Sequence, residues 1–116
     1  MKVRLREGVN VQENGLNGWI FAEKIYPVIS IEQYSSEEIG FRVVSEDSEQ
    51  PVVFKASFFD IVDNIFPVNW RILAVQFGFV HLGPEEFGRP FFWEHYFDKD
   101  PEVLSLYRKA IAEMVY

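Results

Sequence analysis

Hydrophobic and polar residues alternate in several short segments across the first two-thirds of the chain. Over residues 2–6, Val3 and Leu5 fall on one face and three basic residues on the other, which is the period of a half-buried strand. Four further segments, rich in β-branched and aromatic residues, are predicted strands: residues 19–34, 39–45, 51–56 and 72–82. Their spacing of about ten residues is typical of a sandwich or a small barrel.

The hydrophobic period changes in the last third of the chain. Asp100, Pro101 and Glu102 form a helix start, with a capping carboxylate, a proline in the first helical position and an acid in the first turn. Apolar residues recur at helical spacing over residues 103–114. Residues 91–97 hold five aromatic side chains and predict one or two helical turns before this helix.

Two connecting segments complete the expected architecture. Residues 8–18 contain three Gly and three Asn and predict a long loop, whereas residues 57–64 predict a short helical turn with Phe58, Ile61 and Val62 facing inward. The fold class expected is therefore α+β and mainly β, a small antiparallel β-barrel or curved sheet with a C-terminal helical appendage. We expect one domain over residues 1–116, β-rich over 1–82 and helical over 83–116.

Composition narrows the class of protein. The 116 residues are 48% hydrophobic and 25% charged, which excludes a disordered chain, a collagen and a coiled coil. The absence of Cys excludes disulfides, thiolate zinc sites and cysteine nucleophiles. A net charge of −7 argues against nucleic acid as a partner. No apolar run has the length of a secretory signal or a membrane span, so we expect a cytoplasmic protein without a membrane partner.

Candidate catalytic groups are few. Glu94, His95 and Asp98 offer metal ligands in a short span, but they lack the two-His spacing of a zinc protease and the Gly and terminal Glu of a calcium loop. Neighbouring acids such as Glu85 and Glu86 fall in polar turns, where carboxylates are usually solvated. The sequence predicts no enzyme, no metal site and no cofactor.

Two features point to a protein partner instead. Residues 37–50 carry five acids against the single base Arg42, and these acids are candidate partner-binding residues: Glu37, Glu38, Glu46, Asp47 and Glu49. Solubility is the alternative explanation of this charge. The aromatic content is 17%, which leads us to expect exposed rings at Phe87, Phe91 and Trp93. The alternative is that these rings pack the last helix onto the sheet.

Residues 52–70 and 91–114 carry the motifs Phe92-Trp93-Glu94, Tyr96-Phe97 and Asp98-x-Asp100-Pro101. With these segments the chain resembles small bacterial immunity proteins of polymorphic toxin systems, and its first 70 or so residues resemble an SH3-like barrel with a long loop after the first strand. The resemblance implies stoichiometric inhibition by binding, with a basic toxin domain as the partner of this acidic chain. The alternative function is a structural protein that forms homo-oligomers through exposed aromatic surface.

Overall fold

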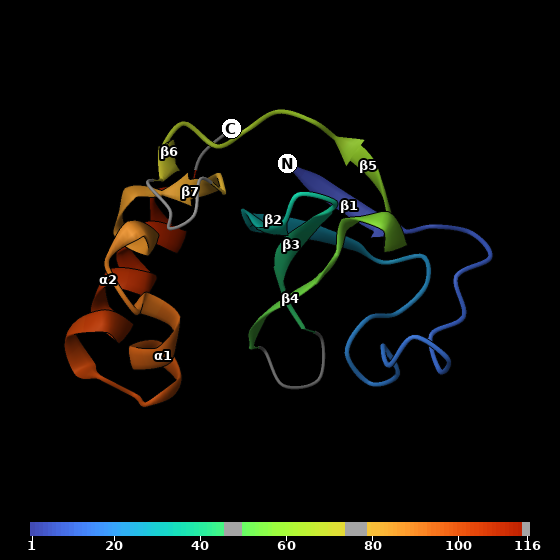
Figure 1. Ribbon diagram of the computed structural model, residues 1–116, viewed down its shortest axis with the longest axis horizontal. Coiled ribbons are helices and arrows are strands. Elements are labelled where there is room, and N and C mark those ends of the chain that lie inside the picture. Colours follow the sequence, from blue (N-terminus) through green and yellow to red (C-terminus); the bar gives the residue numbers. More distant parts are fainter. Residues whose placement is uncertain (46–49, 74–78, 115–116) are drawn as a thin grey trace.

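The computed structural model describes residues 1–45, 50–73 and 79–114. Its elements confirm an α+β, mainly β fold with two helices at the C-terminal end (Figure 1). The strands are β1 (Lys2–Leu5), β2 (Ile25–Ser35), β3 (Glu38–Val44), β4 (Pro51–Lys55), β5 (Phe59–Asp63), β6 (Trp70–Leu73) and β7 (His81–Pro84). The helices are α1 (Phe92–Phe97) and α2 (Pro101–Ala112), with 3₁₀ turns η1 (Ala56–Phe58) and η3 (Glu85–Gly88).

The strands form one antiparallel sheet around the long strand β2. The order is β4-β3-β2-β1-β5, and the hairpin of β6 and β7 joins β2 through β7. Ile31 of β2 pairs with Phe41 of β3 and with Leu82 of β7, so β7 and β3 lie on opposite edges of β2. The sheet does not close into a barrel, so the curved-sheet alternative holds. The expected boundary between the β-rich part and the helical part, at residue 82, falls inside β7.

A β-bulge in β2 lets the sheet face two hydrophobic cores. The pairing of Val28 with Val43 is followed by that of Ser30 with Arg42, so two residues of β2 advance against one of β3. Such a bulge bends the strand and shifts its alternation of faces. Val28 accordingly packs into the core formed with β1 and β5, whereas Ile29 packs into the core formed with η3, α1 and α2.

The long loop predicted after β1 is present and continues to residue 24. Leu16 and Ile20 are its buried anchors, only 1% and 2% exposed, and both belong to the core with β1. The loop therefore covers this face of the sheet, where other folds place a helix or a second sheet.

Three predicted segments differ from the structure. The strand predicted over residues 19–34 begins only at Ile25, because residues 19–24 belong to the long loop. In residues 57–64 the helical turn is limited to η1, and residues 59–63 form β5, because they pair with the free edge of β1. Ile61 and Val62 consequently lie on the surface, 52% and 41% exposed, instead of facing inward. The single strand predicted over residues 72–82 is two paired strands, in which Leu73 lies opposite His81; residues 74–78 are outside the described part of the chain.

The start of α2 confirms its predicted cap. Asp100 Oδ1 accepts hydrogen bonds from the backbone N–H groups of Glu102 at 2.9 Å and Val103 at 3.4 Å. Because this satisfies donors that the helix cannot pair internally, Asp100→Ala should lower the free energy of unfolding by about 1 kcal/mol. Urea unfolding measures the change. Asp98→Ala, which alters an exposed acid two residues earlier, is the control and should leave stability within about 0.5 kcal/mol.

Candidate partner-binding site

A buried ion pair lies where the sheet meets the helices. Ser30, Glu32 and Tyr34 follow one another at every second position of β2, and Arg42 of β3 pairs in register with Ser30. Glu32 Oε1 accepts hydrogen bonds from Tyr34 at 2.6 Å and Arg42 Nη2 at 3.0 Å, while Oε2 accepts from Ser30 at 2.9 Å and from Arg42 Nε. The Glu32 carboxylate is thus held by four donors, and its side chain is only 5% exposed.

The environment keeps Glu32 ionised. Burial alone would raise the pKa of its carboxyl, but the hydrogen bonds and charge of Arg42, with the two hydroxyl groups, outweigh burial and hold the pKa below its usual value. Burial and the neighbouring Glu32 carboxylate raise the pKa of Tyr34 well above its usual value. These shifts keep the Glu32 carboxyl ionised and the Tyr34 hydroxyl protonated around neutral pH.

Arg42 connects the sheet to α1. Its Nη1 donates to the carbonyl of Pro51 at 2.7 Å, and its guanidinium carbon lies 3.9 Å from the centroid of a Trp93 ring. Trp93 in turn packs edge-on against Phe87, Phe92 and Tyr107. Burial raises the pKa of the Tyr107 hydroxyl to about 12. Phe87, Phe92, Trp93 and Tyr107 therefore pack the C-terminal segment onto the sheet.

The three predicted aromatic contacts have different environments. Phe87 is buried in the core and Trp93 is half-buried on Arg42, so neither presents a free ring. Phe91 is 66% exposed and has a left-handed backbone, with φ +57° and ψ +30°. It follows Pro90 in a turn closed by a hydrogen bond from Phe92 N to the Arg89 carbonyl at 3.1 Å. Gly is favoured in such a position, and a bulky residue there costs roughly 1–2 kcal/mol.

A cavity of about 450 Å³ opens beside Phe91. Tyr34, Arg42 and His81 line it from the sheet, and Phe91, Trp93 and Glu94 line it from the helical segment. The ring of His81 lies 6.1 Å from that of Tyr34. Since Glu32 and Arg42 already bond each other, the cavity offers outside groups mainly aromatic faces and the exposed Glu94.

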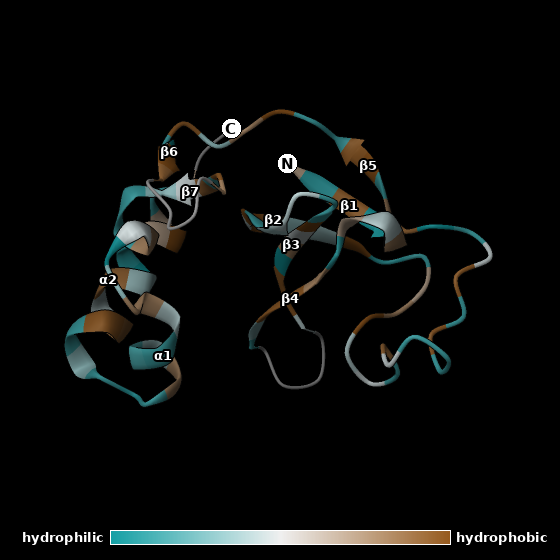
Figure 2. Ribbon diagram, in the orientation of Figure 1, coloured by the Kyte–Doolittle hydropathy of each residue, from teal (hydrophilic) through white to brown (hydrophobic). Residues whose placement is uncertain are grey.

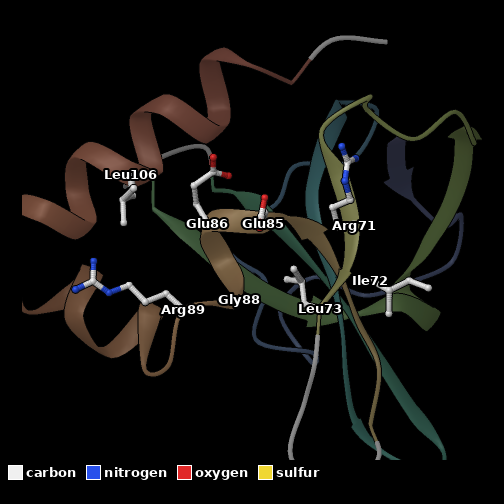
Figure 3. A pocket seen from close by; sticks show the side chains of 8 residues that line it. All are labelled: Arg71, Ile72, Leu73, Glu85, Glu86, Gly88, Arg89 and Leu106. Atoms are coloured by element: carbon white, nitrogen blue, oxygen red, sulfur yellow. The ribbon is translucent and has the colours of Figure 1, made fainter.

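A second cavity of about 590 Å³ separates β6 from η3 and α2 (Figure 3). Glu86 and Leu106 lie on one side of it, and Arg71 and Leu73 on the other. Three of its four charged groups already have partners within the chain: Arg71 donates to two backbone carbonyls, Glu86 pairs with Lys109 at 3.8 Å and Arg89 with Glu102 at 3.0 Å. The fourth, Glu85, is exposed to solvent. We therefore assign this cavity no ligand.

The predicted acidic residues do not form one group in the described part of the chain. Glu37 and Glu38 lie at the start of β3, and Glu38 pairs with Lys55 at 3.4 Å. Glu46, Asp47 and Glu49 fall outside the described residues, after the other end of β3. Arg42, the only base of this segment, is buried on Glu32 and does not offset the surface charge.

Charge is nevertheless unevenly distributed along the chain. Residues 37–50 hold five acids and one base, and residues 83–116 hold seven acids and four bases, which together account for the whole net charge of −7. The remaining segments, 1–36 and 51–82, are each neutral. Phe91 lies in the second of these acidic segments, and the cavity beside it is lined by two acids, Glu32 and Glu94, and by two bases, Arg42 and Arg89.

Two other predicted absences can be compared with the described residues. Among residues 1–45, 50–73 and 79–114, no three His, Asp or Glu side chains are grouped as metal ligands would be. In the same part of the chain, no helix has the length and apolar character needed to cross a membrane.

Reasoning from the sequence missed the Glu32–Arg42 pair. A signal for it exists, because Ser30, Glu32 and Tyr34 place polar groups at period two inside an otherwise apolar segment, and Arg42 interrupts Phe41 and Val43. A buried arginine on the neighbouring strand, facing such a row, pairs its own donors with the polar side chains of the row, so the buried polar groups of both strands are hydrogen-bonded. The strain at Phe91 has no comparable signal apart from the preceding Pro90.

Removing one member of the buried pair should be costly. Arg42→Met leaves the Glu32 carboxylate buried without its cation and should lower the free energy of unfolding by about 3–5 kcal/mol. The double variant Glu32→Leu, Arg42→Met removes both charges and should recover much of this loss. Urea unfolding of the two single variants and the double variant gives the coupling. Equal stability of Arg42→Met and the wild type would contradict the structural role of the pair.

The same pair predicts the direction of acid unfolding. Because the pKa of Glu32 is lowered on folding, its contribution is fully present above the unfolded value near 4.5 and is lost as the pH falls towards the folded pKa. The unfolding free energy should therefore decline as the pH drops below about 4.5. Glu32→Gln should flatten this decline, whereas Glu37→Gln, at an exposed acid, should preserve it. Urea titrations between neutral and acid pH distinguish the two.

Comparison with known proteins gives no assignment. The chain matches no family model, no curated protein and no solved structure.

Proposed function

We propose that this chain is a non-catalytic binding protein, an immunity-type inhibitor that neutralises a cationic toxin domain by 1:1 association. The observation that carries the proposal is Phe91, an exposed aromatic ring kept at a backbone position that favours glycine. Residues in this conformation cluster at functional sites. Three non-glycine residues of the described chain have a positive φ, Glu23, Phe91 and Lys99, and Phe91 is the aromatic one.

The surroundings of Phe91 suit a protein partner. An aromatic ring beside a cavity is the usual form of an interface anchor, because it buries a large area at little conformational cost. The cavity of about 450 Å³ offers room for a side chain of the partner next to the anchor. Tyr34 and Phe91 supply exposed aromatic faces there, which attract a lysine or arginine side chain.

Charge selects the class of partner. Phe91 lies in the acidic segment 83–116, and Glu94 lines the adjacent cavity. The net charge of −7 on the chain attracts a basic domain and accelerates its association. Nuclease toxins fit this requirement because they need positive surfaces to hold phosphate. We place the inhibitor in the cytoplasm, where such a toxin would act.

The ionisable cluster nearest to Phe91 supports a binding role. Glu32 has all its hydrogen-bonding capacity taken by Arg42, Ser30 and Tyr34. A general acid or base must instead exchange a proton near the working pH. The cluster therefore acts as a rigid support for the helical segment that presents Phe91.

The proposal is tested with inactive variants of toxin domains encoded beside this gene. One of them should form a complex with one toxin domain per inhibitor chain on gel filtration, with an association rate that falls steeply as salt is added. The active toxin should lose its activity at one equivalent of inhibitor. Failure of every neighbouring toxin domain to bind would refute the proposal.

Phe91 variants separate the anchor from its backbone strain. Phe91→Ala and Phe91→Gly both remove the ring and should weaken the complex by about tenfold or more. Phe91→Gly also relieves the left-handed backbone, so it should be more stable than Phe91→Ala by about 1 kcal/mol. Calorimetric titration and urea unfolding measure the two effects.

Phe21→Ala is the matched control for this prediction. Phe21 is another exposed phenylalanine, 41% exposed in the long loop, and only its backbone N–H is bonded, to the hydroxyl of Tyr26. Its loss should leave complex formation unchanged. An equal loss of binding in Phe21→Ala would show that the effect is not specific to the Phe91 surface.

A further inference from the structure

The edge strand β5 and the segment after it expose a run of apolar side chains. In the described part of the chain β5 pairs only with β1, so its outer edge ends the sheet. Figure 2 shows hydrophobic colouring on β5 and on parts of the segment that leads from it to β6. The exposed apolar residues here are Ile61 52%, Val62 41%, Ile65 60%, Phe66 48% and Val68 67%.

This edge lacks the usual protection against pairing. Exposed edge strands normally carry lysine, proline or uncompensated charge that discourages a further strand. β5 contains neither lysine nor proline, and one of its two acids, Asp60, pairs with Arg6 at 3.2 Å. Asp63 uses one carboxylate oxygen to accept from the backbone N–H of Ile65.

Charge indicates which partner fits. The net charge of −7 lies entirely in residues 37–50 and 83–116, whereas segments 1–36 and 51–82, which hold β1 and β5, are neutral. A strongly basic partner is attracted to the acidic segments and gains nothing at a neutral edge. Two copies of this chain, in contrast, can meet at β5 without bringing their acidic segments together.

We propose that β5 and the following segment form a homodimer interface, in which β5 pairs antiparallel with β5 of a second copy. A pairing centred on Ile61 places Ile61 opposite its own copy and Asp60 opposite Val62, so no two acids lie directly opposite each other. Ile65, Phe66 and Val68 extend the apolar contact beyond the strand. Ring stacking of Phe66 on Trp70, with centroids 5.1 Å apart, holds part of this surface in place.

The dimer leaves the proposed toxin surface free. In Figure 1, β5 lies at the upper right of the molecule and α1 at the lower left. Each copy in such a dimer therefore still presents Phe91. Self-association at β5 is independent of toxin binding, and either proposal can fail without the other.

The test is the mass of the purified chain in solution. Sedimentation equilibrium up to about 1 mM, a range that captures weak association, should show a dimer of the 13.6 kDa chain. Added salt should leave the dimer intact, because the interface is apolar and locally neutral. A monomer at every concentration, or a dimer that dissociates when salt is added, would overturn the proposal.

Two variants locate the interface. Ile61→Lys places like charges opposite each other and should weaken dimerisation about tenfold or more. Ile65→Lys tests the same surface outside the strand, and circular dichroism checks that both variants fold. The control is Ile39→Lys, at a comparably exposed position (48%) on β3, which is paired on both edges. A dimer that survives both interface variants, or that dissociates in the control, would contradict a β5 interface.

Discussion

The contact between Glu32 and Arg42 determines how the two parts of this molecule meet. Glu32 comes from β2, Arg42 from β3, the carbonyl of Pro51 from β4 and the ring of Trp93 from α1. Charges in such a place are costly to bury, and they are tolerated only when nearly every donor and acceptor is satisfied. Any other placement of α1 would break the contact between the Trp93 ring and the Arg42 guanidinium. We infer that the pair selects one docked arrangement of the helical segment, more than it adds net stability.

The bulge in β2 makes this contact possible. A regular strand would turn Val28 and Ser30 to one face and Ile29 and Ile31 to the other. The register shift instead lets Val28 and Ile31 pack on the first core, while Ile29 packs on the second. Both faces of β2 and β3 are thereby covered, one by the long loop with β1 and β5, the other by the helices. With the centre of the sheet occupied on both sides, the edges of the sheet and the helical segment offer exposed surface to partners.

Local patterns predicted those elements whose stability is local. Val3 and Leu5 alternate because β1 has one buried face, and Asp100 with Pro101 starts α2 through a cap that needs only its own next residues. Elements defined by distant partners were not predictable in this way. Residues 59–63 have the composition of either a helical turn or a strand, and the free edge of β1 decides between them. Likewise, Arg42 reads as a surface base of an acidic hairpin until its distance from Trp93 is known.

Phe91 and β5 are two places where local preference and observed structure disagree. Most of the chain obeys the rule that residue type, backbone conformation and burial agree, and departures from it usually mark function. At Phe91 the residue type conflicts with the backbone, and at β5 the apolar residues conflict with their exposure. The two conflicts differ in their electrostatics, since Phe91 lies in an acidic segment and β5 in a neutral one. Under the two proposals, a basic partner would cover Phe91 and a second copy of the chain would cover β5, so the two interfaces would not compete for the same surface.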